Sequence, residues 1–157
     1  MSKKRLSQTK KNIVFLGHMG SGKSTIGRGL SKKLGLDFYD TDKEIEKEMG
    51  QKIAKIFDES GESIFRNIEK KITLKLLDKK NSIIALGGGG FEDLKIRKLI
   101  LNKCNSIWLK CDLNILEKRC KVSKKRPLLS NKNIKAEFER LNTVSYTHLT
   151  LPTICSV

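Results

Sequence analysis

The chain has 157 residues, of which 32% are charged and 38% hydrophobic, and its formal net charge is +16. A length of this order suits one domain with a single sizeable core. No apolar run of roughly 18 residues is present and no apolar segment of signal-peptide form follows the basic N-terminus, so we expect a cytoplasmic protein without a membrane-spanning helix.

The first elements predicted along the chain are a strand, a helix and a second strand. Residues 1–10 are basic, and we expect them to form a disordered arm. Asn12–Leu16 is a short apolar run rich in strand formers that ends at glycines. The spacing of the next segment predicts a helix over Lys23–Leu34, closed by Gly35, and a second strand follows at Leu36–Asp40.

Two helices are expected after this strand. Thr41–Glu44, with the sequence TDKE, has the capping-box pattern, so a helix should begin directly after the strand. Apolar residues then recur every four positions, which predicts an amphipathic helix from about Glu62 to Lys79. The residues that carry this period are Ile64, Ile68, Ile72 and Leu76.

Strands and helices continue to alternate in the following segment. We expect a third strand at Ser82–Leu86, a helix at Leu94–Lys103, a fourth strand at Ser106–Lys110 and a helix at Leu113–Val122. Short strands that alternate with helices predict an α/β fold in which helices cover both faces of a parallel sheet. Such sheets bind ligands beyond the carboxyl ends of their strands.

The first motif at that edge is GHMGSGKST, from Gly17 to Thr25. It fits the pattern G-x-x-x-x-G-K-[ST], and its place between a strand and a helix makes the match specific. The glycines let backbone N–H groups converge on phosphate oxygens. We expect Lys23 to bridge the β- and γ-phosphates of ATP and Ser24 to bind Mg²⁺. The predicted nucleotide-binding residues are Gly20, Ser21, Gly22, Lys23, Ser24 and Thr25.

A pair of aspartates, Asp40 and Asp42, follows the second strand. Beside Mg·ATP, one carboxylate can hold the waters of the metal and a second can accept a proton from a substrate hydroxyl. Taken alone, the pair equally suits the N-terminus of a helix, where the helix dipole favours negative charge. The adjacent phosphate loop favours the functional interpretation.

Three further motifs contain arginines or glycines. GESIFRNIE places Arg66 near the start of the long helix, where the spacing alone favours an exposed arginine paired with Glu62 or Glu69. Four consecutive glycines, Gly87–Gly90, carry a large entropy cost, so a close approach of the backbone to a ligand is expected there. KKRPLL places Arg126 in a basic loop that either closes over a phosphoryl group or is a solvated turn.

With these five motifs in this order, the chain resembles the shikimate kinases from about Lys11 to Arg140. The resemblance implies a P-loop NTPase fold of the nucleoside-monophosphate-kinase type. It also implies that ATP phosphorylates the 3-hydroxyl of shikimate, giving shikimate 3-phosphate on the route to chorismate and the aromatic amino acids. ATP and Mg²⁺ would be the cofactors, and the enzyme would be a cytoplasmic monomer that binds neither nucleic acid nor membrane.

The resemblance also implies roles for individual residues. Lys23 and Ser24 match the phosphate and Mg²⁺ residues, and Asp40 matches a residue that assists the metal through water. Asp42 matches the aspartate that binds the shikimate hydroxyls and is the candidate catalytic base. The other matches are Arg66 and Arg140 for the shikimate carboxylate, Gly87, Gly88 and Gly89 for N–H groups that face the substrate, Arg119 for stacking on adenine, and Arg126 for the catalytic lid arginine.

The end of the chain differs in character from the rest. Leu141–Val157 contains no charged residue, whereas shikimate kinases continue here into a tyrosine-containing segment, a further strand and a closing helix. Val144–Thr153, VSYTHLTLPT, resembles a translated transposon-end sequencing adaptor; the alternative is a genuine edge strand, because YTHLTL alternates. We expect an incomplete domain over residues 11–143, without its last strand and helix, and a non-native tail over residues 144–157.

Two other functions remain open. One is another small-molecule P-loop kinase, such as a gluconate kinase, although the glycine run, the DTD motif and Arg66 argue against it. The other is a basic nucleic-acid-binding module that contains a phosphate loop, which would show a steep salt dependence of binding. Because the lysines are scattered and few aromatic residues lie between them, a solvated surface and an anionic substrate are favoured.

Overall fold

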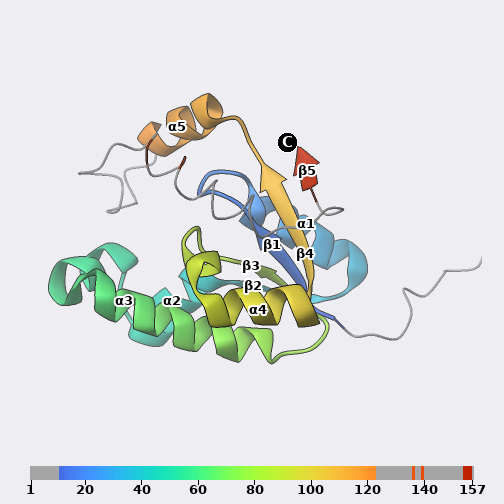
Figure 1. Cartoon of the computed structure of the whole chain (residues 1–157), viewed down its shortest axis with the longest axis horizontal. Helices are drawn as coiled ribbons and strands as arrows, with labels where there is room; N and C mark the ends of the chain where they lie inside the picture. The colour runs from blue at the N-terminus through green and yellow to red at the C-terminus, as the bar shows by residue number, and fades with distance from the viewer. Residues whose placement is uncertain (1–10, 123–135, 137–138, 140–153, 157) are drawn as a thin grey trace, which may run out of the picture.

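A single parallel sheet with helices on both faces organises the chain (Figure 1). The computed structural model describes residues 11–122, 136, 139 and 154–156. The strands are β1 (Ile13–Leu16), β2 (Asp37–Asp40), β3 (Ser82–Ala85), β4 (Asn105–Lys110) and β5 (Ile154–Ser156). They lie in the order β2-β3-β1-β4-β5, and every neighbouring pair is parallel. The predicted α/β class is confirmed.

The helices connect these strands. Their bounds are α1 (Lys23–Leu34), α2 (Thr41–Met49), α3 (Ile53–Leu77), α4 (Leu94–Lys103) and α5 (Leu113–Val122), with a short 3₁₀ helix, η1 (Gly90–Glu92), before α4. Helices α1, α4 and α5 have the bounds that the sequence predicts. Among the described residues, no helix is both long and apolar enough to cross a membrane.

Alternate residues of the strands enter two hydrophobic layers, because successive side chains of a strand point to opposite faces of a sheet. Val14, Ile84 and Trp108 pack with apolar side chains of α2, α3 and α4. Phe15, Ile83 and Leu109 instead form a layer with Leu30 of α1 and with Phe38. Each such side chain, when fully buried, contributes on the order of 1.5–3 kcal/mol. The sheet beneath the site is therefore covered by a hydrophobic layer on each face.

Helix α2 begins directly after β2, as predicted, and its cap is Asp40 of the aspartate pair, the helix-cap alternative for that pair, rather than Thr41 of the capping-box pattern. The carboxylate of Asp40 accepts hydrogen bonds from the N–H groups of Asp42 (3.1 Å) and Lys43 (3.4 Å), so Asp40 is the N-cap. An aspartate at this position satisfies free N–H groups and suits the helix dipole. Thr41, the cap expected from the capping-box pattern, lies inside the first turn and is buried.

Helix α3 is longer than predicted and contains a kink. It begins at Ile53 rather than at Glu62, and Gly61 has the non-helical angles φ 78° and ψ 172°. Such angles are essentially restricted to glycine. The predicted helix is the second segment, which starts immediately after this kink. The first segment carries Ile53, Ile56 and Phe57, whose spacing is itself a helical signal.

The edge of the sheet beside β4 also differs from expectation. The sequence predicts that the last strand is missing, yet β5 pairs with Trp108–Lys110 of β4 in parallel register. A strand ladder uses backbone groups only, so an open sheet edge accepts a short extended segment of almost any sequence. The expectations for residues 1–10 and 144–153 concern residues outside the described part of the chain and stay predictions.

The strand register aligns the carboxyl ends of three strands. Phe15 of β1 and Asp40 of β2 both lie beside Ala85 of β3, and the N–H of Leu86 donates to the carbonyl of Phe15 at 3.1 Å. The loop after β1, the aspartates after β2 and the glycines after β3 therefore start at one level. This is the edge at which parallel sheets bind ligands.

Candidate active site

The loop from Gly17 to Gly22 turns tightly between β1 and α1. Gly17, Gly20 and Gly22 have positive φ angles of 139°, 80° and 96°, which favour glycine. A methyl group on Gly17 would also lie 2.7 Å from the backbone oxygen of Leu109 in β4. The backbone of this phosphate loop therefore requires glycine independently of any ligand.

Lys23 is held inside this loop. Its side-chain ammonium donates to the carbonyls of Gly17 and His18, both at 2.7 Å, and the residue is only 9% exposed. The first turn of α1 contains no acidic residue, and no side chain caps its N-terminus. Both features leave a positively polarised helix end beside the lysine, which favours phosphate binding.

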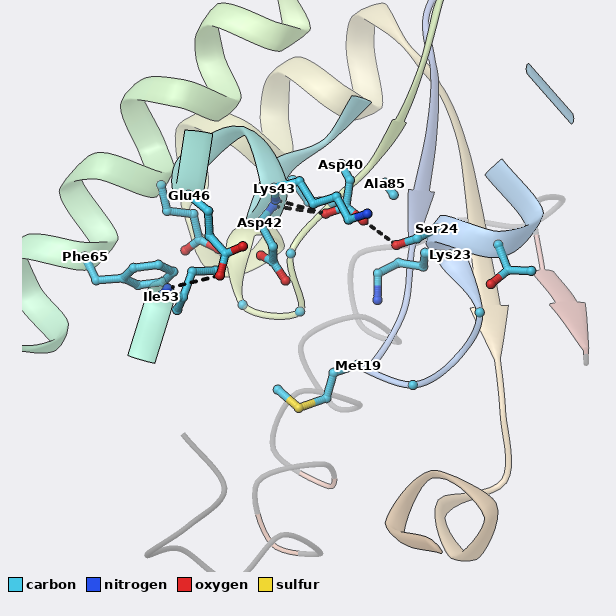
Figure 2. Close-up of a pocket in the computed structure, with 18 of the residues that line it drawn as sticks. Met19, Lys23, Ser24, Asp40, Asp42, Lys43, Glu46, Ile53, Phe65 and Ala85 are labelled. Atoms are coloured by element: carbon cyan, nitrogen blue, oxygen red, sulfur yellow. Dashed lines mark hydrogen bonds between the residues drawn. The ribbon is translucent and has the colours of Figure 1, made fainter. Parts of the chain in front are cut away.

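Ser24 and Asp40 connect the phosphate loop with β2. The Ser24 hydroxyl donates to Asp40 Oδ2, while Oδ1 of the same carboxylate caps α2 (Figure 2). Hydroxyl and carboxylate oxygens are the ligands that Mg²⁺ takes, usually with one or two carboxylates and the substrate phosphates completing its shell. The described residues contain no group of three or more metal-binding side chains, so a Mg²⁺ ion here would depend on phosphate oxygens.

A cavity of about 480 Å³ lies beyond these residues. Its size falls in the range of small-molecule sites, roughly 300–1,000 Å³. Predicted site residues from four segments line it: Gly20, Gly22, Lys23, Ser24, Thr25, Asp40, Asp42, Arg66, Gly87, Gly88 and Gly89. Ser21, in contrast, is fully buried and is not among the lining residues. The fold thus brings most of the predicted site together around one space.

Arg66 combines the two interpretations that its sequence position allows. Its guanidinium pairs with Glu69 at 2.7 Å and with Glu62 at 3.5 Å along α3. The same side chain is 31% exposed and lines the cavity. Arg66 is therefore both a helix ion-pair partner and a group that an anion in the cavity can reach.

Glu69 is the buried partner of this pair, with a side chain only 5% exposed. Burial raises the pKa of its carboxyl above the usual range, and the charge and hydrogen bond of Arg66 offset this only in part. Burial by itself lowers the pKa of Arg66, but the attraction of Glu69 reverses the effect and raises it. The Arg66 guanidinium therefore remains charged. It lines the cavity beside Glu69 and can donate hydrogen bonds to an anion there.

The glycine run after β3 packs closely against charged side chains. A methyl group on Gly87 would lie 2.8 Å from both Asp42 Oδ1 and Glu69 Oε1, and one on Gly89 would overlap the guanidinium of Arg66. The N–H of Gly87 donates to Thr41 Oγ1 at 2.7 Å. This amide is therefore used within the protein, which differs from the expectation that all three glycine N–H groups face the substrate.

Several residues at the site were not predicted as site residues: Met19, Lys43, Glu46, Ile53 and Phe65 line the cavity, and Thr41 and Glu69 hold its polar groups. Thr41 lies between the two predicted aspartates, and Glu69 enters the prediction only as a possible helix partner of Arg66. The sequence does not indicate a role for the threonine in DTD, because its hydrogen-bond partner is the N–H of Gly87, 46 positions away. The Glu69 signal was its i,i+3 spacing from Arg66, which by itself indicates only a helix surface pair.

The three remaining predicted arginines have different outcomes. Arg119 of α5 donates to the backbone oxygen of Gly20 at 3.0 Å and contacts the Cys111 sulfur at 3.9 Å, so it lies beside the phosphate loop. Stacking of Arg119 on adenine stays a prediction. Arg126 and Arg140 lie outside the described residues, and their roles stay predictions as well.

A parallel sheet with a phosphate loop after β1, an adjacent hydroxyl–carboxylate pair and a cavity lined by aspartate and arginine defines a P-loop kinase. The model of the shikimate kinase family matches residues 19–151. The chain belongs to the shikimate kinase family.

Individual relatives agree with this assignment. Over 133 residues the chain is 47% identical to the shikimate kinase of Persephonella marina, a match that covers 83% of this chain and 80% of the relative. The structure is similar to that of shikimate kinase from Acinetobacter baumannii in complex with shikimate. That match has a TM-score of 0.84 at 29% identity and covers 95% of this chain and 83% of the other.

A gluconokinase from Sinorhizobium meliloti is similar as well, with a TM-score of 0.54 at 14% identity, covering 96% of this chain and 83% of that one. At this identity the likeness concerns the fold alone. The gluconate kinase alternative therefore shares an architecture with the chain, whereas the family match singles out the shikimate kinases.

Proposed function

We propose that this chain transfers the γ-phosphoryl group of ATP to the 3-hydroxyl of shikimate. The observation that carries the proposal is the cavity onto which the phosphate loop, Asp42, Arg66 and the glycine run all open. Shikimate is a small anion with three hydroxyls. A guanidinium suits its carboxylate, and a carboxylate together with backbone N–H groups suits its hydroxyls. The similarity to a shikimate kinase solved with shikimate supports the choice of substrate.

In the proposed reaction, the phosphate loop and Lys23 bind the phosphates of ATP. Lys23 would exchange its bonds to the carbonyls of Gly17 and His18 for bonds to phosphate oxygens. Ser24 and Asp40 would hold Mg²⁺, directly or through water. When bound, Mg²⁺ neutralises part of the phosphate charge.

Asp42 is the proposed acceptor of the proton from the substrate hydroxyl. It lines the cavity together with Lys23 and Ser24, and Gly87 lies directly against its carboxylate. Arg66 would hold the substrate carboxylate and so fix which hydroxyl faces the phosphate, because phosphoryl transfer depends mainly on positioning and charge neutralisation. Arg126 would close over the transferred group and Arg140 would add a second contact to the carboxylate. The enzyme would act in the cytoplasm as a monomer.

The test is the release of ADP by the full chain in the presence of ATP, Mg²⁺ and shikimate, together with the variant Arg66→Ala. A charge-assisted hydrogen bond contributes about 1.5–3 kcal/mol, so the shikimate KM should rise by roughly 10- to 150-fold. The KM for ATP should stay unchanged, because Arg66 lies on α3 and not on the phosphate loop.

Arg28→Ala is the matched control, since Arg28 is exposed on α1 and does not line the cavity. It should change neither KM. If the wild-type chain releases no ADP with shikimate, or phosphorylates gluconate instead, the proposed function is wrong. Equal losses of shikimate and ATP affinity in Arg66→Ala would contradict the role of Arg66.

A further inference from the structure

Thr41 connects two of the segments that form the cavity. The residue is 0% exposed, and its hydroxyl donates to the backbone oxygen of Ala85 at 3.3 Å. The hydroxyl oxygen of Thr41 in turn accepts a hydrogen bond from the N–H of Gly87 at 2.7 Å. One hydroxyl thus uses its donor and an acceptor position at once, and joins the first turn of α2 to the end of β3.

This connection determines how the glycine run meets Asp42. Asp42 follows Thr41 directly, and its carboxylate lies so close to Gly87 that a methyl group there would approach Oδ1 to 2.8 Å. The Gly90 N–H donates to the carbonyl of Gly87 at 3.0 Å, which folds the run into a tight turn. Within the described part of the chain, the N–H groups of Gly88 and Gly89 have no hydrogen-bond acceptor.

We propose that Thr41 is a positioning residue of the site: by engaging the N–H of Gly87 it holds the glycine run against Asp42 and leaves only Gly88 and Gly89 to donate to a substrate. The inference rests on the proposed function for the identity of that substrate. The substrate class is a polyhydroxylated carboxylate whose hydroxyls reach Asp42 and two adjacent amides.

The chemistry of the contact explains why a hydroxyl is needed. Valine has nearly the shape of threonine, but it would leave the buried N–H of Gly87 and the carbonyl of Ala85 without their partner. The turn would then relax away from its present position against Asp42. Serine keeps both hydrogen bonds and loses only a methyl group.

Kinetics of three variants test the role. In Thr41→Val, kcat/KM for shikimate should fall by about tenfold or more, because a small displacement of aligned groups is costly in phosphoryl transfer. The KM for ATP should remain within roughly twofold of wild type, since the contact does not involve the phosphate loop. Thr41→Ser should restore kcat/KM for shikimate.

Thr73→Val is the matched control. Thr73 is also 0% exposed, lies on α3 away from the cavity, and its hydroxyl has no hydrogen-bond partner among the described residues. The same substitution there should leave both kinetic constants unchanged. If Thr41→Val lowers the thermal midpoint but keeps the shikimate constants of wild type, Thr41 is merely structural and the proposal is overturned.

Amide hydrogen exchange of the wild-type protein gives a readout that needs no variant and no activity. The Gly87 N–H should exchange more slowly than those of Gly88 and Gly89, and added shikimate should shift the latter two resonances. If Gly87 exchanges as fast as its neighbours, the inference is wrong even when shikimate is phosphorylated. If Gly87 is protected but shikimate is neither bound nor phosphorylated, the proposed function fails while the Thr41 contact stands.

Discussion

Glu69 and Asp93 are two acidic residues whose pKa values respond to the fold in opposite directions. Burial raises the pKa of Glu69, and Arg66 does not compensate for it fully. Burial also acts to raise the pKa of Asp93, but its ion pair with Lys70 and the N–H groups of α4 outweigh this and lower it. The native protein therefore binds a proton at Glu69 more tightly, and at Asp93 less tightly, than the unfolded chain does.

These shifts predict two opposite pH dependences of stability. Above about pH 4.3, the ordinary glutamate pKa, unfolded chains lose the proton that native Glu69 still holds, so the contribution of this residue to stability falls as pH rises. The stability of Glu69→Gln relative to wild type should therefore increase between pH 4 and pH 7, as measured by urea denaturation at each pH.

Asp93→Asn provides the opposite case. The stabilisation from Asp93 is present above its unfolded pKa of about 3.9 and disappears as pH falls through the lower native value. The free energy of unfolding of Asp93→Asn should therefore fall furthest below that of wild type near neutral pH, and the difference should shrink on acidification. If both variants showed the same slope against pH, the assigned directions of the pKa shifts would be wrong.

At the scale of elements, Gly61 determines where the second segment of α3 begins and thus where Arg66 lies. A side chain at Gly61 would have free space around it, so the cost of Gly61→Ala comes from its φ of 78° and ψ of 172° alone. We expect a loss of about 1–3 kcal/mol in the free energy of unfolding, measured by urea denaturation with an unchanged m value.

Gly29 is the matched control for this substitution. It lies inside α1, and an added methyl group would contact nothing there either. Because alanine is the better helix former, Gly29→Ala should stabilise the protein by about 0.5–1 kcal/mol. If Gly61→Ala left the free energy of unfolding unchanged while Gly29→Ala raised it, the kink at Gly61 would not be required for stability.

The sequence predicts elements best where local signals agree. Helix α1 has a clear apolar period and a glycine at its end, and both of its bounds were predicted. The segment at Ile53 was missed because Gly61 interrupts the periodic run, although the helix continues on both sides of the kink. The strand β5 was not expected, since pairing at an open edge depends on the partner strand and not on the added sequence.

In the site, too, residues in local motifs could be predicted and residues that depend on tertiary contacts could not. Lys23 and Ser24 could be placed at the cavity because the phosphate loop is a local pattern with a fixed chemistry, and Asp40 because it follows the second strand; their roles stay predictions. Thr41 could not, because its partners Ala85 and Gly87 are far away in the sequence and the contact exists only once β2 and β3 lie side by side. Tertiary contacts of this kind leave no trace in spacing.

At the scale of the whole molecule, the two hydrophobic layers share one sheet, so neither can separate without exposing the other. Trp108 is the only tryptophan of the chain, is 1% exposed, and belongs to the layer with α3 and α4. Its neighbour Leu109 belongs to the layer with α1. Unfolding should therefore be a single cooperative transition.

Tryptophan fluorescence and far-ultraviolet circular dichroism check this expectation. The urea midpoints from the two signals should coincide, because Trp108 reports one layer and the helices report both. A fluorescence midpoint clearly below the circular dichroism midpoint would mean that the layer around Trp108 opens first. The cooperative description would then be wrong.

The strand order also determines how long β1 lacks a partner strand while the chain is synthesised on the ribosome. β1 pairs with β3 and β4 but not with β2, and its first partner residue, Ile83, lies 70 residues after Ile13. At about 5–20 residues per second, nascent β1 waits roughly 4 to 14 seconds for any neighbour. During that interval the apolar run of β1 is exposed next to the emerging α1, and a chaperone that shields it would raise the yield of folded enzyme without touching the finished site.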